Sequence, residues 1–456
     1  MSGGCAPSYN AHQPTRRRCA IAVVIGLSGI SGAEPRSAID EGGARRPPSS
    51  SPVRGSQPDR EFRSTTGTCG EAVPPQGWSF WSRACSFRHP VCACGYPGWK
   101  GRELTDVVTA VDRAWETLVG VIGVPQPERG MDGQWNLYLG DAVDGGGQAY
   151  LVALDPRTRF ALGSSFGRID RSASGCMLDL AVARAVAQGS LLASSPTTAK
   201  GLGLAESEEL ARLATPCAAF DDDEAAFQSE PERTLVDGSS TSFARGGAAF
   251  FEWLDARFGR APGAMVPALW ALTPDRADVR SASGRSVATA FDVLATSLRG
   301  AFTSAATLDE VFVGFAVARV AMWPPVLPAW NVSWPARPRR LVSPIPVSPT
   351  GASYVVIHRE GAAPGTRLRL EAEWEDYARM RWVVLKLDSG GGTLGQIRVS
   401  SPDRATKAAL TLDAMDGIDR VVVVGVNVGS TEHAFSPAQG EWEPHGWMLT
   451  IEGLGP

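Results

Sequence analysis

Apolar residues recur at helical spacing through the middle of the chain, between residues 176 and 321. The segment "GGAAFFEWLDARFG" (246–259) shows this pattern. Its apolar positions fall at i, i+3, i+4, i+7 and i+11, and so share one face of a helix: Gly247, Phe250, Phe251, Leu254 and Phe258. Gly259 follows the last of them, where a helix commonly ends. This segment is therefore expected to form a helix.

The same spacing predicts helices elsewhere in the chain. They are expected over 102–119, 176–192, 203–214, 221–228, 261–273, 286–300 and 307–322. Thr307 and Glu310 have the spacing of a capping box, which marks the start of the last helix. Two strands are expected at 134–140 and 148–154, joined by a loop that contains Asp141 and Asp144. Those aspartates are candidate cation contacts, although aspartate is also common in plain turns.

The period of the pattern changes after residue 340. Seven short runs follow, several of them alternating, at 352–358, 366–374, 380–388, 395–401, 408–414, 419–428 and 446–453. Seven such runs within about 110 residues predict an antiparallel β-sandwich domain over 341–456. The preceding segment, 323–340, holds five prolines and three tryptophans. It is interpreted as a stiff linker, because it suits neither a regular helix nor a central strand.

The N-terminal region has the order of a secretory signal. Three arginines, at 16–18, precede an apolar run over 19–30, and "SGA" (31–33) supplies small residues before a cut after Ala33. The run is too short to span a bilayer comfortably, so no transmembrane segment is expected after signal removal. A buried N-terminal strand is the alternative. Residues 34–66, rich in Pro, Ser, Gly and Arg, are interpreted as a disordered tether.

The signal implies an exported compartment, namely the periplasm, the outer envelope or the extracellular space, and the composition is that of a folded protein. The chain has 456 residues, of which 43% are hydrophobic and 20% charged, enough for two or three domains with full cores. The net charge of −4, with no large basic block in the folded part, excludes a nucleic-acid partner. We expect a monomer.

Cysteine usage points in the same direction. Six cysteines remain after removal of residues 1–33: Cys69, Cys85, Cys92, Cys94, Cys176 and Cys217. An even set in an exported chain favours disulfides, and the last two are expected to pair with each other. The connectivity of the first four stays open. A small zinc site built from these four is less favoured, because their spacing is not that of two CxxC knuckles.

The order of elements over about 100–320, together with "GGAAFFEWLDARFG" and "TLDEVFVGFAVARVAM" (307–322), resembles the catalytic region of gluzincin-like, HExxH-type secreted zinc peptidases. The resemblance implies an α+β chain. A mostly helical, metallopeptidase-like domain over 67–322, with a small N-terminal β portion, would be followed by an antiparallel β-sandwich. It also implies a zinc site made by two histidines at i and i+4, an adjacent glutamate base, and a glutamate from a later helix.

The residues of that zinc site are not found in this sequence. In the matching helix, "DLAVARAVAQGSL" (179–191), Leu180 and Arg184 fall at the histidine positions and Ala181 at the position of the base. Lys200 falls at the position of the later glutamate. The five histidines are His12, His89, His358, His433 and His445, so none lies between residues 90 and 357. We therefore predict no catalytic residue, no metal ligand and no cofactor.

Arg184 is the most informative residue of this degenerate site, because a buried arginine requires an acidic partner or a bound anion. One interpretation is a structural salt bridge, with Glu206 as the expected partner. The other is an anion-accepting cleft formed together with Lys200. The candidate pseudo-active site thus comprises five residues: Leu180, Ala181, Arg184, Lys200 and Glu206.

The function predicted from the sequence is that of an exported, non-catalytic pseudo-peptidase that binds a peptide or a cell-envelope component. Two alternatives stay open. One is an active hydrolase with an unrecognised site. The other is a structural or adhesive envelope protein that acts through its β-sandwich. The sequence does not identify the ligand.

Overall fold

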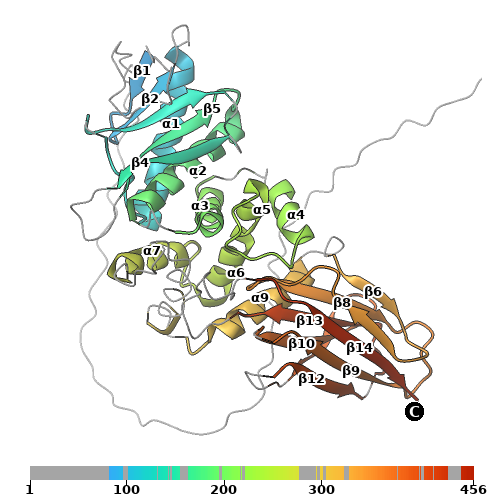
Figure 1. Ribbon diagram of the computed structural model, residues 1–456. Coiled ribbons are helices and arrows are strands. Elements are labelled where there is room, and N and C mark those ends of the chain that lie inside the picture. Colours follow the sequence, from blue (N-terminus) through green and yellow to red (C-terminus); the bar gives the residue numbers. More distant parts are fainter. Residues whose placement is uncertain are drawn as a thin grey trace, which may run out of the picture. The chain divides into compact units, whose positions relative to one another are not determined.

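The computed structural model describes residues 82–95, 101–154, 163–276, 298–322 and 328–455, with gaps inside these ranges of which the longest is 430–442 (Figure 1). Its fold is α+β, as expected. The predicted signal peptide (1–33), the predicted tether (34–66) and most of the predicted helix over 286–300 lie outside the described residues.

A five-stranded mixed sheet forms the N-terminal part of the described chain. Its strands are β1 (Ser82–Cys85), β2 (Val91–Gly95), β3 (Trp135–Gly140), β4 (Gly147–Leu154) and β5 (Gly163–Asp170), in the order β1-β2-β3-β5-β4. The three central strands run parallel, and β1 and β4 are antiparallel edges. The strands β1 and β2 lie before residue 100, in a part of the chain for which the apolar pattern predicted no element. β5 was not predicted, because its small and polar residues show little alternation of apolar and polar positions. In the sheet it lies between β3 and β4.

Two long helices pack with this sheet (Figure 1). α1 (Gly101–Trp115) continues as a π-helical segment, η1 (Glu116–Ile122), and ends at Gly123 with φ +85°, three residues later than expected. α2 (Gly175–Ser194) packs against β4, β5 and α1, and its residues from Leu180 to Leu191 are all buried. α2 is the one described helix long and apolar enough to cross a membrane. Most of it is buried inside the protein, which is typical of a core helix.

The middle of the chain is helical, as predicted. Its helices are α3 (Lys200–Ala214), α4 (Asp221–Ser229), α5 (Thr241–Gly246), α6 (Ala248–Phe258), α7 (Met265–Arg276) and α9 (Leu308–Met322). The helix expected over 246–259 begins only at Ala248, because Gly247 interrupts the helical hydrogen bonding between α5 and α6. Gly246 lies so close to α4 that an added Cβ would be 2.1 Å from the Asp223 carbonyl oxygen. The capping box of α9 is present, because Thr307 N–H donates to Glu310 and Glu310 N–H to the Thr307 hydroxyl.

The C-terminal part contains two packed sheets. All seven predicted runs form strands: β8 (Ala352–His358), β9 (Arg367–Trp374), β10 (Met380–Leu387), β11 (Thr393–Val399), β12 (Lys407–Leu412), β13 (Arg420–Asn427) and β14 (Trp447–Leu454). The segment interpreted as a linker adds β6 (Trp330–Ser333) and β7 (Arg339–Val342). The sheet orders are β11-β10-β13-β8-β6 and β12-β9-β14-β7. The linker interpretation was wrong for these residues, although both strands are edges, where proline-flanked segments are tolerated.

α9 covers the outer face of the sheet that contains β10 and β13. These central strands are therefore buried on both faces. One hydrophobic cluster includes Phe312 and Phe315 of α9 together with Tyr354, Val422 and Val424. The Tyr354 hydroxyl donates to the Ala316 carbonyl oxygen of α9 at 2.9 Å. Burial on both faces explains why the valines of β13 are uninterrupted. A strand with one exposed face would alternate apolar and polar residues.

Candidate functional site

The three residues of α2 in the candidate pseudo-active site, Leu180, Ala181 and Arg184, are all buried. Leu180 has no exposed surface, and Ala181 and Arg184 are 1% and 4% exposed. Ala181 packs directly against the beginning of β4, since a Cβ on Gly147 would lie 1.9 Å from the Ala181 carbonyl oxygen. Further along, the Ala149 N–H of β4 donates to Gln188 of α2 at 2.9 Å. The strand and the helix are therefore in close contact at Ala181.

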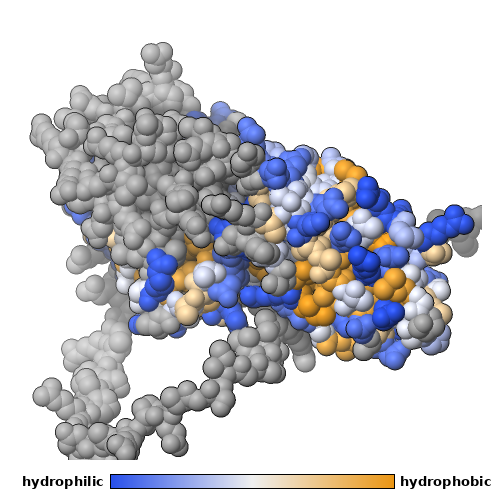
Figure 2. Space-filling model, turned by 60° about the horizontal axis from the view of Figure 1, so that its bottom comes forward, coloured by the Kyte–Doolittle hydropathy of each residue, from blue (hydrophilic) through white to orange (hydrophobic). Residues whose placement is uncertain are grey.

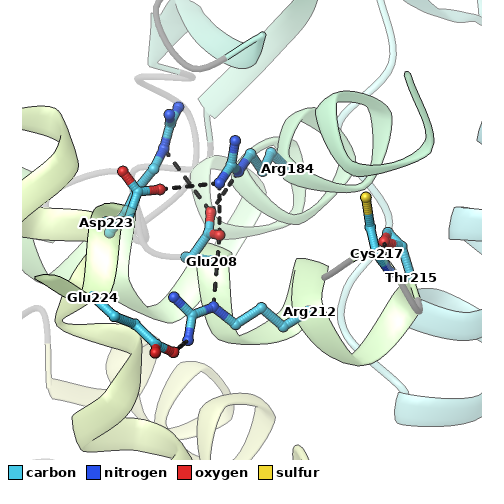
Figure 3. Close-up of polar contacts among 8 residues, drawn as sticks. Arg184, Glu208, Arg212, Thr215, Cys217, Asp223 and Glu224 are labelled. Atoms are coloured by element: carbon cyan, nitrogen blue, oxygen red, sulfur yellow. Dashed lines mark hydrogen bonds and ion pairs between the residues drawn. The ribbon is translucent and has the colours of Figure 1, made fainter. Parts of the chain in front are cut away.

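Arg184 forms a bidentate ion pair with Glu208 of α3 (Figure 3). Arg184 Nε donates to Glu208 Oε2 at 2.5 Å, and Nη2 donates to Oε1 at 2.7 Å. Nη2 also reaches Asp223 of α4 at 3.2 Å. A structural salt bridge was one of the two interpretations of Arg184, but the expected partner, Glu206, was wrong. Glu206 lies two residues from Glu208 on α3, which turns its side chain about 200° away around the helix axis.

Glu208 is the centre of a larger buried ion network. Its side chain has no exposed surface, and Arg212 and Arg245 lie 3.6 Å and 3.9 Å from its oxygens. Arg212 also pairs with Glu224 of α4. Counted with Asp223, the network holds three guanidinium groups and three carboxylates, so its formal charges balance. Burial and the neighbouring Glu208 raise the pKa of Asp223, while Arg184 opposes the shift.

Lys200 does not join this network. It begins α3, its side chain is exposed, and its Cβ lies beside Gly238. Lys200 therefore does not meet the candidate residues of α2. The carboxylate of α3 that contacts Arg184 is Glu208. The sequence signal was available in "ESEE" (206–209), but only the packing of α3 on α2 shows which glutamate faces Arg184.

Two other glutamates of α3 are buried, and neither is in direct contact with a cationic side chain of the described residues. The Trp270 indole N–H of α7 donates to Glu206 Oε2 at 2.9 Å, and burial raises the pKa of Glu206 to about 7. The pKa of Glu209 is raised to about 8, first by burial and then by Glu252 and Asp255 of α6. Both carboxyls therefore take up protons more readily than exposed glutamates do.

Disulfides fix the ends of this helical pair. Cys176, at the start of α2, is bonded to Cys217, just beyond α3, with 5.5 Å between their Cα atoms. Cys85 and Cys92 are bonded across the β1–β2 pair. Cys94 is disulfide-bonded as well, whereas Cys69 lies outside the described residues. Disulfides are typical of oxidising compartments, which agrees with an exported protein.

No cluster of three or more His, Cys, Asp or Glu side chains is placed to hold a metal ion in the described part of the chain. The three described histidines lie apart: His89 stacks on Trp115, His358 contacts Asn331, and His445 contacts Glu375.

The segment "GSSFG" (163–167) has the letter pattern of a hydrolase nucleophile elbow. Its central Ser165 lies within β5 and not at a strand–helix turn, and its hydroxyl accepts a hydrogen bond from the Trp135 indole. Ser165 is therefore a structural hydroxyl.

Comparison with known proteins gives no family for this chain: no family model and no curated protein matches it. Part of the fold is similar to the pre-peptidase C-terminal domain of a collagenase from Bacillus anthracis, at 6% identity and a TM-score of 0.19, covering 27% of this chain and 94% of that one. Another similar chain is the active domain of a bacteriophage CBA120 tailspike protein, at 12% identity and a TM-score of 0.18, covering 25% and 15%. A chain of Bacillus endospore appendages, which form disulfide-linked pili, matches at 11% identity and a TM-score of 0.14, covering 26% and 88%.

Proposed function

We propose that the chain is an exported, non-catalytic relative of the HExxH-type zinc peptidases, and that it acts by binding a peptide or a component of the cell envelope. The observation that supports this most is the bidentate pair between Arg184 and Glu208. In the peptidases that the sequence resembles, a metal ion joins two histidines of one helix to a glutamate of a later helix. Here a guanidinium of the first helix contacts the carboxylate of the later helix directly, and its fixed positive charge opposes a cation at that place.

The other residues of α2 support the same proposal. Leu180 has no ligand atom, and Ala181 has no group that could accept a proton from water. The contact between Ala181 and Gly147 also leaves no room for a side chain on Gly147 at the strand–helix boundary. Hydrolysis by the mechanism of the family requires all of these groups together, so what remains for this region is structure and recognition.

Zinc content and peptidase activity test the non-catalytic half of the proposal. Purified protein is expected to contain far less than one zinc per chain and to leave casein uncut. The R184H variant is expected to behave in the same way, because Leu180 and Ala181 remain. About one zinc per chain bound within residues 100–320, or cleavage that a chelator abolishes, would contradict the proposal.

A gain-of-function variant tests the relationship to the peptidases. L180H/R184H places two histidines at i and i+4 of α2 while Glu208 remains on α3, so we expect this variant to bind zinc. The same substitutions combined with E208Q are the matched control and are expected to bind it much more weakly. Circular dichroism and thiol titration check that both variants fold. A folded L180H/R184H variant without zinc affinity would contradict the relationship but not the absence of catalysis.

The binding half of the proposal requires its own experiment. Purified chain is sedimented with isolated cell-wall and membrane fractions and is separately used to select from a random peptide library. We expect saturable retention by one of these ligand classes. Retention by none of these ligand classes would favour the alternative function, that of a purely structural envelope protein.

A further inference from the structure

An exposed basic segment lies at one edge of the sandwich. β7 is the last strand of its sheet and, among the described strands, pairs with β14 alone. Arg337, Arg339 and Arg340 are exposed, and none of the three forms an ion pair with a described residue. The sequence offers them few partners, since no aspartate or glutamate occurs between Glu310 and Glu360. On the adjoining strand, the acidic Glu452 lies opposite Arg369 of β9 and beyond the residues that pair with β7.

Two exposed aliphatic side chains adjoin these arginines. Val342 is 63% exposed and Ile345 is 53% exposed. Arg340 and Val342 are two residues apart on β7, so their side chains leave the same face of the strand, whereas Leu341 between them faces the core and is 5% exposed. We call these five residues the β7 edge: Arg337, Arg339, Arg340, Val342 and Ile345.

Single exposed apolar residues are ordinary on protein surfaces. On the face drawn in Figure 2, apolar and charged residues are indeed intermixed where the chain is described. The β7 edge differs in its combination, because its aliphatic residues stand beside three arginines that form no ion pair with a described residue. A ligand that combines anionic groups with an apolar region would complement both kinds of side chain.

We propose that the β7 edge docks the protein on an anionic phospholipid bilayer. Lipid phosphates at the membrane surface satisfy the arginines, and the boundary between headgroups and acyl chains accepts Val342 and Ile345. A soluble polyanion would satisfy the arginines only. An added peptide strand would find just four residues of β7, followed by Pro344 and Pro346, which have no N–H to donate. This inference deepens the proposed function, because it names the envelope component that the exported chain contacts.

Vesicle flotation tests the docking. The processed chain is mixed with phosphatidylcholine vesicles that contain or lack phosphatidylglycerol, at low and at high salt. We expect flotation with the anionic vesicles only, and its loss at high salt. The R337Q/R339Q/R340Q variant is expected to lower the partition coefficient about a hundredfold, on the basis of about fivefold per arginine near an anionic surface. The V342S/I345S variant is expected to weaken binding at unchanged salt dependence.

A matched control lies on the opposite edge of the sandwich. R398Q/L394S removes one exposed arginine and one exposed leucine from β11, and it is expected to float like the unmodified chain. All proteins in this comparison are the processed form that begins near Glu34, so the N-terminal apolar run takes no part in the binding. Equal flotation with both vesicle types, or no loss in the triple arginine variant, would overturn the proposal. Equally tight binding of soluble polyphosphate that V342S/I345S leaves unchanged would assign the edge to a polyanion instead.

These outcomes are separate from those that test the peptidase relationship. Zinc binding and cleavage report on α2 and α3, whereas flotation reports on β7. A chain that lacks zinc and does not float would retain the non-catalytic proposal and lose the bilayer. A chain that cleaves casein and floats would retain the docking on a bilayer and contradict the non-catalytic proposal.

Discussion

Arg184 of α2 bonds both carboxylate oxygens of Glu208, a residue of α3, and neither side chain is more than 5% exposed. Taking two charges out of water is costly, and the cost is offset only when both stay paired. The two helices are also joined by the Cys176–Cys217 disulfide. The pair and the disulfide together fix α2 against α3.

The first prediction concerns this ion pair. R184M is expected to lower the free energy of unfolding by about 3 kcal/mol, because it leaves the buried Glu208 without its closest cation. E208Q is expected to have a similar effect, and the R184M/E208Q double variant to cost less than the sum of the two. Urea denaturation at neutral pH measures all three. The control is R113A, which breaks the exposed pair with Asp179 and should cost less than about 1 kcal/mol.

The second prediction concerns pH. The pKa values of Glu206 and Glu209 rise to about 7 and about 8 in the folded protein, above the ordinary value of 4.5. The folded state thus binds more protons than the unfolded state between pH 4.5 and pH 8, so this contribution to stability is complete below pH 4.5 and is lost as the pH rises to 8. E206Q, which keeps an acceptor for Trp270, is expected to be more stable than the unmodified chain at pH 9.

The measurement is the thermal midpoint as a function of pH. At pH 4.5 the E206Q variant and the unmodified chain should have similar midpoints, because Glu206 is then protonated in the folded state. E373Q, on the outward face of β9, is the control and should leave the slope between pH 5 and pH 9 unchanged. An E206Q variant with the same slope as the unmodified chain would show that Glu206 does not carry the pH dependence.

The third prediction concerns the disulfides. The Cys176–Cys217 bond joins residues 41 positions apart, and the chain-entropy relation gives about 4 kcal/mol for a loop of that size. The Cys85–Cys92 bond joins residues seven positions apart, for which the same relation gives about 2.5 kcal/mol. C176S/C217S is therefore expected to destabilise the chain more than C85S/C92S. The reverse order in urea denaturation would mean that native-state packing outweighs loop closure.

The helical periodicity and the alternating runs located most of the fold, because each of those elements buries one continuous stripe or face. The elements that were missed lack such a signal. β5 is small and polar, and β6 and β7 stand in a segment rich in proline. The break at Gly247 results from the close approach of α5 to α4, a tertiary contact that no local pattern records.

The candidate site was predicted less well than the fold. The burial of Arg184 and its need for a carboxylate followed from the apolar residues around it. The identity of the carboxylate did not, because Glu206, Glu208 and Glu209 share one helix and only its rotation against α2 selects Glu208. The exposed arginines of the β7 edge were equally hidden, since the exposure of an edge strand depends on the sheet order.

The fourth prediction concerns processing. The three arginines, the apolar run and "SGA" predict that the exported protein begins near Glu34 and carries no free thiol. Intact-mass spectrometry of protein from the exported fraction, with and without alkylation, measures both properties. Replacement of the arginines at 16–18 by glutamine should cause unprocessed chain to accumulate. A chain found in the cytoplasm with its first 33 residues intact would contradict export.

The fifth prediction is that the helical region and the sandwich unfold together. α9 shares a hydrophobic cluster with the central strands of the sandwich, and Tyr354 bonds its Ala316 carbonyl. A second contact joins the same two regions. The Thr350 hydroxyl accepts a hydrogen bond from the Leu235 N–H at 2.9 Å, and Thr350 itself has φ +70°. A threonine in that backbone region is strained and is retained only where its surroundings hold it.

Calorimetry of the full chain is therefore expected to show one transition. Y354F should lower the midpoint temperature of this single transition, because the loss of one hydrogen bond lowers the free energy of unfolding by about 1 kcal/mol. Y150F, which removes a hydroxyl bonded to Gln148 at the β4 edge, is the matched control and should cost less because its hydroxyl is closer to solvent. Two resolved transitions, with Y354F shifting only one of them, would show that the sandwich is an independent domain. It would then be suited to study by deletion of residues 328–456, which include β6 and β7. If the two regions unfold together, the same deletion would expose the buried face of α9.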